Sequence, residues 1–358
     1  MKVGISLLTL VPGVVGGSET YVRELTRALR RVGELEYEAF VPPLAPDAAD
    51  GLPTRVISEY GAGSSTRGRA SAMARAWARP GRLRRALRFQ SLDAVHFPLS
   101  VMIPPPGSAT PAAVTVHDLQ HELYPQFFSR AELAYRRVLY HQSVRSSRIV
   151  IAISEHARET LLARYELDPS RVVAIPLGID HERLRPAEDP EPREPFLLYP
   201  ANPWPHKNHA RLYEAFALLR GERPELGLVL TGAGHDPAAL PEGVESRGRV
   251  PYAELVRLYR TASALVFPSL YEGFGLPPLE AMACGCPVAV SRATSLPEVC
   301  GDAAEYFDPS SPEDMARAVT GVLDDPARYV QRGLGRARLY TWESTARAHE
   351  DVYRLLAA

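Results

Sequence analysis

Residues 264–283 read Ala-Leu-Val-Phe-Pro-Ser-Leu-Tyr-Glu-Gly-Phe-Gly-Leu-Pro-Pro-Leu-Glu-Ala-Met-Ala. The stretch begins with an apolar run at 264–267 that is typical of a buried strand, and it passes through a turn with two glycines. It ends in an apolar segment at 278–283 that favours a helix. Pro277 and Pro278 suit a first helical turn, where a missing N–H costs little. The stretch therefore predicts strand, turn and helix in succession, which is the repeating unit of an α/β protein.

The same alternation runs along the rest of the chain. Apolar runs of strand length alternate with segments whose apolar residues recur at helical intervals, which predicts parallel sheets with helices on both faces. The predicted strands are 3–8, 94–97, 113–116, 149–153, 172–175, 196–199, 226–230, 264–267 and 288–290, and the predicted helices are 18–31, 130–144, 155–164, 210–219, 252–260, 278–283, 315–323 and 344–355. We expect Ser18 to cap the first of these helices.

The domain organisation follows from length and composition. A chain of 358 residues predicts two domains, at roughly 150 residues each. The Pro-rich and charged segment 184–195 is typical of a linker. We therefore expect two tandem Rossmann-like, doubly wound domains, at 1–185 and 186–340, followed by a last helix in 341–358. Such domain pairs bind ligands in a cleft between the carboxyl ends of their sheets.

The composition excludes several classes of protein. With 46% hydrophobic and 23% charged residues, the chain is neither disordered nor fibrous. A net charge of -1 argues against a nucleic-acid partner. Three cysteines cannot form a disulfide framework, and neither a membrane-spanning run nor a signal-peptide cleavage pattern is present. We therefore expect a cytoplasmic protein with small buried cysteines.

The turn within 264–283 has the features of a phosphate site. Free N–H groups at a helix start favour an anion. Glu272 and Glu280 flank the turn, and carboxylates accept hydrogen bonds from hydroxyls. A diphosphate with hydroxyl-bearing groups at each end fits this pattern. The alternative is an ordinary turn with two solvated glutamates.

Lys207 is a candidate cation for the same site. Only Lys2 and Lys207 are lysines in a chain with 41 basic residues, so a lysine within a motif is unexpected. It precedes a predicted helix, with Asn208 as the expected N-cap. A fixed cation there would stabilise charge developing on a leaving diphosphate. The alternative is a surface lysine.

His117 follows the predicted strand 113–116, and ligand residues gather where parallel strands end. Asp118 is a candidate to orient its ring. The alternative is a capped loop histidine. His121 completes an H-D-x-x-H spacing that could ligate a metal, but we expect no metal site.

Several segments together resemble the retaining nucleotide-sugar glycosyltransferases of family 4, which have the GT-B fold. Glu272 and Glu280 form the E-x7-E motif of that family. The matching segments, in order along the chain, are 16–20, 117–118, 152–155, 176–180, 204–208, 231–234, 248–250 and 272–280. Residues 117–122 and 124–129 are similar to a subgroup linked to mannose or rhamnose transfer. The resemblance also implies that the last helix crosses back to the first domain.

The resemblance implies roles for the second half of the chain. Glu280 would hold the ribose hydroxyls, Glu272 would face the donor sugar, and Lys207 would serve the diphosphate. Asn202 lies where many members of the family have an arginine, and it is neutral; His206 is a candidate to compensate. The remaining implied donor-binding residues are Gly273, Phe274, Gly275, Leu276, Gly232, Arg249 and Val250.

The resemblance also implies roles for the first half. His117 would lie near the donor sugar. Gly16 and Gly17 would form a glycine loop that closes on the diphosphate or the acceptor, although a tight turn between strand and helix explains them equally well. Asp118 and Ser154 belong to the implied acceptor side. The family arrangement needs neither a metal nor another cofactor.

A basic segment is left over from these motifs. No acidic residue occurs between Glu59 and Asp93, whereas eight arginines do. They are Arg67, Arg69, Arg75, Arg79, Arg82, Arg84, Arg85 and Arg88. The segment could contact an anionic membrane face or an anionic acceptor. A solvated helix face in an arginine-rich chain explains it as well, and we favour that interpretation.

The sequence thus predicts a retaining glycosyltransferase. Its donor would be a nucleoside-diphosphate sugar, GDP-mannose or a similar hexose or deoxyhexose donor, and its acceptor a hydroxyl of a glycan, glycolipid or natural product. We expect it in the cytoplasm, with peripheral contact at the inner membrane face if the basic segment binds lipid. Two alternatives stay open: a nucleotide-sugar 2-epimerase of similar fold, and a non-catalytic subunit that binds nucleotide sugars.

Overall fold

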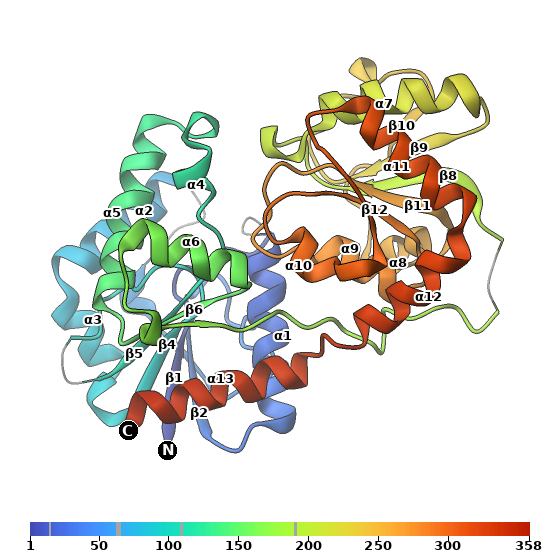
Figure 1. Ribbon diagram of the computed structural model, residues 1–358. Helices are drawn as coiled ribbons and strands as arrows, with labels where there is room; N and C mark the ends of the chain where they lie inside the picture. The colour runs from blue at the N-terminus through green and yellow to red at the C-terminus, as the bar shows by residue number, and fades with distance from the viewer. Residues whose placement is uncertain (14–15, 62–65, 108–109, 190–191) are drawn as a thin grey trace. The chain divides into compact units, whose positions relative to one another are not determined.

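The computed structural model describes residues 1–13, 16–61, 66–107, 110–189 and 192–358 (Figure 1). The chain forms two compact units. Unit 1 comprises Met1–Gly178 together with Trp342–Ala358, and unit 2 comprises Ile179–Thr341. None of the helices in the described ranges is long and apolar enough to span a bilayer.

Unit 1 is built on a parallel sheet of seven strands in the order β3-β2-β1-β4-β5-β6-β7. The strands are β1 (Lys2–Ser6), β2 (Glu36–Val41), β3 (Thr54–Val56), β4 (Ala94–Phe97), β5 (Ala112–Val116), β6 (Ile149–Ala152) and β7 (Val172–Ala174). The helices are α1 (Gly17–Val32), α2 (Thr66–Ala78), α3 (Pro80–Ala86), α4 (Gln120–Leu123), α5 (Arg130–Ser146), α6 (Glu155–Tyr165) and α13 (Trp342–Ala357).

The two faces of this sheet carry different side chains, because successive residues of a strand point to opposite sides. Val95 and Phe97 of β4 join an apolar core with residues of α2, α3, α5 and α6. His96 points to the other face, where α1 and α13 pack against each other. The sheet is therefore covered on both faces, as the sequence predicted.

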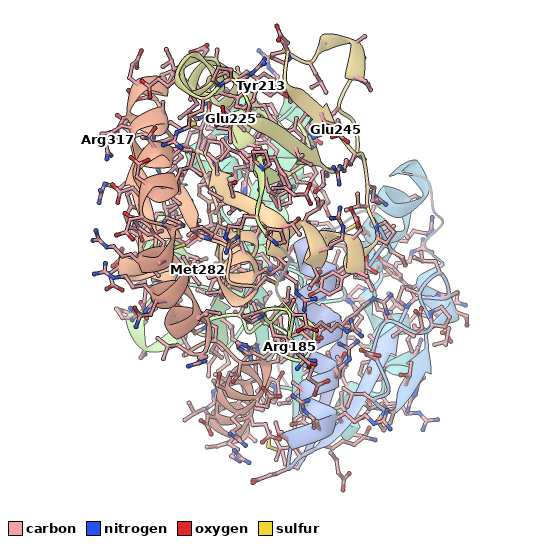
Figure 2. The ribbon with its side chains drawn as sticks, turned by 90° about the vertical axis from the view of Figure 1, so that its right-hand side faces the viewer. Arg185, Tyr213, Glu225, Glu245, Met282 and Arg317 are labelled. Atoms are coloured by element: carbon pink, nitrogen blue, oxygen red, sulfur yellow. The ribbon has the colours of Figure 1, made fainter. Side chains whose placement is uncertain are left out.

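Unit 2 repeats the plan with a parallel sheet of six strands in the order β10-β9-β8-β11-β12-β13. The strands are β8 (Glu194–Pro200), β9 (Gly227–Thr231), β10 (Val244–Ser246), β11 (Ala262–Phe267), β12 (Val288–Ser291) and β13 (Glu305–Phe307). The helices are α7 (His209–Glu222), α8 (Tyr252–Thr261), α9 (Leu276–Ala283), α10 (Leu296–Cys300), α11 (Pro312–Asp324) and α12 (Pro326–Ala337). In Figure 2, Met282 of α9 lies inside this unit, whereas Arg317 of α11 points outward.

The prediction of α/β architecture with doubly wound parallel sheets is confirmed. Strands β2, β3, β10 and β13 and helices α2, α3, α4, α10 and α12 were not among the predicted elements. Three of the missed strands, β3, β10 and β13, are edge strands of three residues each. Edge strands are half exposed, so they lack the long apolar run by which a central parallel strand is recognised. The three cysteines are buried free thiols, as expected.

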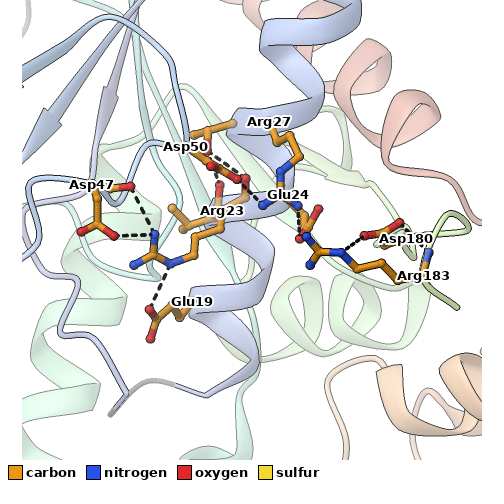
Figure 3. Close-up of polar contacts among 10 residues, drawn as sticks. Glu19, Arg23, Glu24, Arg27, Asp47, Asp50, Asp180 and Arg183 are labelled. Carbon is orange, nitrogen blue, oxygen red and sulfur yellow. Dashed lines mark hydrogen bonds and ion pairs between the residues drawn. The ribbon is translucent and has the colours of Figure 1, made fainter. Parts of the chain in front are cut away.

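Helix α1 begins one residue earlier than expected. Its first residue is Gly17, and Gly16 occupies the N-cap position without a side-chain hydrogen bond. The prediction that Ser18 caps the helix was therefore wrong. Ion pairs then fix the outer face of α1 to the loop after β2 (Figure 3): Arg23 contacts Asp47 at 3.3 Å, and Arg27 contacts Asp50. Such exposed pairs contribute about 0–1 kcal/mol each, so the buried face of α1 supplies most of its stability.

Helix α13 belongs to unit 1 although it follows unit 2 in the chain. Glu350 of α13 is 2% exposed and accepts hydrogen bonds from the backbone N–H groups of Glu34 and Leu35, at 2.7 and 3.1 Å. It also accepts a hydrogen bond from the hydroxyl of Tyr37. The Glu350 carboxylate thereby provides the hydrogen-bond acceptor for two backbone N–H groups just before β2 begins.

Candidate active site

The turn between β11 and α9 has the strand–turn–helix form that the sequence predicted. Gly275 is the N-cap of α9, with φ of 111°. A Cβ at this position would lie 2.7 Å from Cδ2 of Leu296, so only glycine fits without a shift. Hydrogen bonds from the Ser295 hydroxyl to the carbonyls of Glu272 and Phe274, at 3.0 and 2.8 Å, hold the turn from the α10 side.

The first turn of α9 leaves few backbone donors. Pro277 and Pro278 have no N–H, and the N–H of Leu279 bonds within the helix, so the donors that remain at this end are those of Gly275 and Leu276. The partial positive charge of a helix N-terminus favours an anion at this point. Phe274 and Gly275 are buried, whereas Gly273 and Leu276 are half-buried, so the turn presents backbone to solvent at Gly273.

Lys207 and Glu272, which are 65 positions apart, form an ion pair. Nζ of Lys207 lies 2.6 Å from Oε1 of Glu272, and their side chains are 14% and 13% exposed. The ammonium also lies 5.5 Å from the ring centroid of Phe267, the last residue of β11. Two of the predicted catalytic residues are therefore in direct contact where β8 and β11 end side by side.

The backbone around Lys207 is fixed by neighbouring side chains. Lys207 ends the short 3₁₀ helix η5 (Pro205–Lys207), and its carbonyl accepts a 2.7 Å hydrogen bond from the hydroxyl of Tyr199. Asn208 occupies the N-cap position of α7, but its side chain makes no capping bond. Its amide instead donates to the carbonyls of Pro268 and Pro309, at 3.0 and 2.8 Å. The N-cap position of Asn208 is therefore confirmed, but its side chain does not cap the helix; it ties together loops that follow β8, β11 and β13.

Glu280 lies one turn into α9 and is half-buried. Its Oε2 accepts a 2.9 Å hydrogen bond from the hydroxyl of Tyr259 in α8. Burial raises the pKa of the Glu280 carboxyl, and the Tyr259 hydrogen bond opposes that rise. The carboxyl group therefore has one fixed donor and keeps capacity for further ones.

Asn202 has a partner that the sequence did not indicate. Its Oδ1 accepts a 2.8 Å hydrogen bond from the backbone N–H of Ala233, in the loop after β9. Gly232 has φ of 119°, and a Cβ there would lie 2.8 Å from the same oxygen. The N–H of Gly232 donates to the carbonyl of Gly248 at 2.8 Å. Asn202 and Gly232 are thus brought together next to the segment with Arg249, which is exposed, and Val250, which is half-buried.

Histidines surround the start of α7. The carbonyl of His206 accepts a 2.8 Å hydrogen bond from the N–H of Leu270, which links η5 to the glycine turn. The His209 ring lies 5.1 Å from that of His235. Burial, together with repulsion from His235 and Lys207, lowers the pKa of His209 to about 4. His209 is therefore neutral near pH 7 and supplies no second cation.

In unit 1, His117 lies just after β5 and is 8% exposed. Its Nε2 lies 2.7 Å from the carbonyl oxygen of Pro98, so Nε2 carries a proton and donates. The Tyr21 ring packs edge-on against it, with 4.9 Å between centroids. Burial lowers the pKa of His117. The ring is therefore neutral and held in one orientation.

Asp118 does not orient His117 by a hydrogen bond, contrary to expectation. Its Oδ1 accepts instead from the N–H of Gln120, at 3.2 Å, where α4 begins.

Ser154 is fully buried and caps α6, because its Oγ accepts from the N–H of Ala157 at 3.0 Å. Gly16 and Gly17 are exposed at the start of α1. A Cβ on Gly16 or Gly17 would meet no atom within 4 Å, so steric crowding does not explain why these two residues are glycines.

Sequence reasoning missed the residues that hold the site without touching it directly. Tyr199 lay in a predicted strand and Tyr259 in a predicted helix, with no role assigned to either, and Ser295 lay in no predicted element. Each is a hydroxyl whose partner lies on another element, so no local pattern reveals it. The only signal in the sequence that could have indicated such a residue was a polar group within an apolar run. Among the described residues, no group of three or more His, Cys, Asp or Glu side chains could hold a metal.

The basic segment forms α2, α3 and the turn after them. Arg75, Arg79, Arg82, Arg85 and Arg88 are exposed. Arg84 is half-buried and donates to the carbonyl of Pro105 at 2.6 Å. The side chains of Arg67 and Arg69 lie outside the described residues. Most of the described arginines are therefore available to solvent.

Comparisons with known proteins show the family of the chain. The family model of group 1 glycosyl transferases matches residues 180–334, and that of glycosyltransferase family 4 matches residues 15–183. The chain is 32% identical over 275 residues to O-antigen chain mannosyltransferase B of Escherichia coli, which covers 68% of this chain and 70% of the relative.

Two solved structures share the fold. Sucrose-phosphate synthase from Thermosynechococcus elongatus aligns with a TM-score of 0.78 and 21% identity, over 99% of both chains. Anabaena HepE, solved in complex with UDP and glucose, aligns with a TM-score of 0.73 and 15% identity, over 99% of both chains. The chain therefore belongs to glycosyltransferase family 4: it is a glycosyltransferase with the GT-B fold, and its relatives include mannosyltransferases.

Proposed function

We propose that the protein transfers mannose, or a similar hexose or deoxyhexose, from a nucleoside diphosphate to an acceptor hydroxyl, with retention at the anomeric carbon. The observation that carries the proposal is the contact of Lys207 with Glu272 at 2.6 Å, beside the start of α9. A cation, a carboxylate and helix N–H groups meet there. These are the groups that a sugar diphosphate needs.

In this proposal the diphosphate binds the backbone of residues 273–276 and Lys207 Nζ. Its negative charge would draw the ammonium away from Glu272, whose carboxylate would then accept hydrogen bonds from the sugar hydroxyls. Glu280 would accept from the ribose hydroxyls, and residues 248–250 would meet the base. Asn202 and His206 complete the donor side; Asn202 acts through the backbone of Ala233, to which it is bonded.

The acceptor side of the proposal belongs to unit 1. His117 would present a neutral, fixed ring near the sugar. Gly16 and Gly17 would let a ligand approach the start of α1, and Asp118 and Ser154 would shape the loops beside it. The acceptor is a glycan, a glycolipid or a smaller hydroxyl compound. Retention would follow from attack on the same face of the sugar, with the leaving phosphate accepting the acceptor's proton.

Mannose is the favoured sugar because O-antigen chain mannosyltransferase B is 32% identical to the chain. A panel of guanosine, uridine and thymidine diphosphates and their sugars tests the donor by thermal stabilisation, since a ligand of the folded state raises the melting temperature. NMR of the product's anomeric proton then reads the stereochemistry. Inversion at that carbon would overturn the retaining mechanism.

Measuring the release of nucleoside diphosphate with and without an acceptor separates the proposal from its two alternatives. A 2-epimerase would convert the nucleotide sugar without an acceptor, and a non-catalytic subunit would bind it unchanged. The proposal predicts stoichiometric release of nucleoside diphosphate only when an acceptor is present. If no nucleotide sugar raises the melting temperature, the proposal that the protein binds such a donor is contradicted.

The exposed arginines of α2 and α3 support a second, separate proposal: peripheral contact with anionic lipid, at the inner face of the membrane. Sedimentation with anionic vesicles should fall steeply between low and high salt, because screening weakens such contacts. No sedimentation at either concentration would leave a solvated helix face as the explanation.

A further inference from the structure

A groove of about 550 Å³ opens on unit 1. Helices α2, α5 and α6 and the short helix α4 line it. The residues on which its chemistry depends are Trp77, Glu122, Arg137, Gln142, Arg164 and Tyr165. None of them was singled out as a site residue from the sequence.

Trp77 gives the groove an aromatic wall. The residue is 49% exposed, and its indole N–H donates a 2.6 Å hydrogen bond to Oε1 of Gln142. That bond joins α2 to α5 and fixes the direction of the ring. A half-exposed indole that is held in place offers a flat apolar surface, as the aromatic walls of ligand sites do. The C–H-rich face of a hexose packs well on such a surface.

Tyr165 supplies a buried hydroxyl group. Its side chain is 6% exposed and lines the groove, and its hydroxyl makes no hydrogen bond within the described ranges of the chain. Burial raises the pKa of the hydroxyl, so it stays protonated. Because a buried unpaired hydroxyl costs stability, a ligand oxygen that accepts a hydrogen bond from it would be bound favourably.

The charged groups of the groove do not select an anion. Arg137 lies 3.4 Å from Oε1 of Glu122, which leaves both signs of charge close together. Arg164 adds donors, and Gln142 adds an amide. Carboxylate, guanidinium and amide groups beside an aromatic ring suit the many hydroxyls of a saccharide, which both donate and accept.

The groove is within reach of His117 along the same unit. Glu122 lies five positions after His117, so the chain between their Cα atoms spans at most about 17 Å. An oligosaccharide of several units can bridge such a distance, whereas a monosaccharide cannot.

We propose that this groove binds saccharide units of the acceptor glycan, away from the hydroxyl that reacts. This inference rests on the proposed function and adds to it, because it makes the acceptor an oligosaccharide or longer glycan. The groove is then a subsite for chain length and has no part in the chemistry of transfer.

The first test compares α-linked mannose oligosaccharides of two and six units as acceptors, with the donor that stabilises the full chain. The six-unit acceptor should have the lower KM. Trp77→Ala and Tyr165→Phe should each raise that KM by roughly fivefold to tenfold, the loss expected for one contact. The kcat and the KM of the two-unit acceptor should not change. Leu218→Ala, which removes an exposed apolar side chain of α7, is the matched control.

Tyr165→Phe also guards against misfolding. It removes a hydroxyl without a partner in the described structure, so the variant should be at least as stable as the wild type. A purely structural role would change its stability and leave the ratio of the two KM values alone. Equal KM values for both acceptors in the wild type, or unchanged ratios in both variants, would overturn the inference.

A binding experiment separates this inference from the proposed function. The six-unit oligosaccharide alone, without donor, should change the tryptophan fluorescence of the wild type but not of Trp77→Phe. That result supports the groove even if no donor is found. An identical change in Trp77→Phe would place binding elsewhere and contradict the inference. Variants that alter only sedimentation with anionic vesicles would assign the groove to lipid, and that outcome would also overturn it.

Discussion

The hydroxyl of Tyr21 in α1 lies 2.8 Å from Nε2 of His349 in α13, although 328 positions separate the two residues along the chain. The same hydroxyl lies 3.0 Å from Oγ1 of Thr115. Thr115 in turn meets Nε2 of His96 at 2.7 Å, and Nδ1 of His96 meets the hydroxyl of Tyr353 at 2.8 Å. The chain of hydrogen bonds joins α1, β4, β5 and α13.

One set of proton positions satisfies every member of this chain. The Tyr353 hydroxyl donates to His96, His96 to Thr115, Thr115 to Tyr21, and Tyr21 to His349. Both imidazoles must then be neutral, since each uses one nitrogen as an acceptor. Burial agrees with this, because it lowers the pKa of both histidines. The network ties the last helix to the ring that packs on His117.

Lowering the pH should therefore destabilise the folded state of unit 1. Burial lowers the pKa of His349 to about 4, from 6.5 in the unfolded chain. Between these values the unfolded state binds a proton that the folded state does not. The free energy of unfolding should fall as the pH drops from about 6.5 towards about 4, by about 3 kcal/mol for this group. Urea unfolding at pH 7, 5.5 and 4 measures the slope.

Two variants show whether His349 causes this slope. His349→Gln should be less stable at pH 7 and should lose that part of the pH dependence. His141→Gln, which changes an exposed histidine, should keep it. An unchanged slope in His349→Gln would assign the acid sensitivity to other groups.

The pair of Lys207 and Glu272 predicts opposite effects on binding and transfer. Glu272→Gln frees the ammonium from its partner, so a nucleoside diphosphate should bind more tightly while transfer is lost. Lys207→Ala should weaken diphosphate binding and lower kcat by about 10²–10³, as for the loss of one transition-state contact. Calorimetric titration with the diphosphate and steady-state rates measure both quantities. Weaker diphosphate binding in both variants would contradict the inference that the ion pair with Glu272 restrains Lys207.

Gly275→Ala should damage the donor site through the backbone. The φ of 111° and the 2.7 Å approach of Leu296 Cδ2 to an added Cβ force the turn to move. We expect a loss of about 1–3 kcal/mol in unfolding free energy and of diphosphate binding. Gly335→Ala is the matched control, because its Cβ would lie in open space within α12 and should stabilise the helix slightly. Thermal melts with and without ligand distinguish the two.

Glu280 predicts a pH dependence of nucleotide binding. Its carboxylate must be ionised to accept two ribose hydroxyls, and burial raises its pKa. Affinity should therefore be full at neutral pH and decline, as the pH falls, before an ordinary glutamate would protonate. Tyr259→Phe removes a hydrogen bond that lowers this pKa, so it should move the decline to higher pH. Titration of a nucleoside diphosphate across pH 4–8 measures the midpoint. A midpoint unaffected by Tyr259→Phe would exclude Glu280 as its origin.

The sequence by itself determined the alternation of strands and helices and the placement of the glycine turn. Central parallel strands are buried on both faces, and helix starts have strong local chemistry, so both leave a signal in a few consecutive residues. Family membership could be inferred in the same way, from the order and spacing of short motifs such as Glu272 and Glu280.

Only the tertiary structure decided which side chains meet. The contact of Lys207 with Glu272, the hydrogen bond from Ala233 to Asn202 and the network of Tyr21 with His349 all join residues on different elements. Local propensity concerns a residue and its chain neighbours, whereas these contacts depend on strand order and sheet register. The sequence could therefore name the residues of the proposed donor site, but only the fold determined which residues they contact.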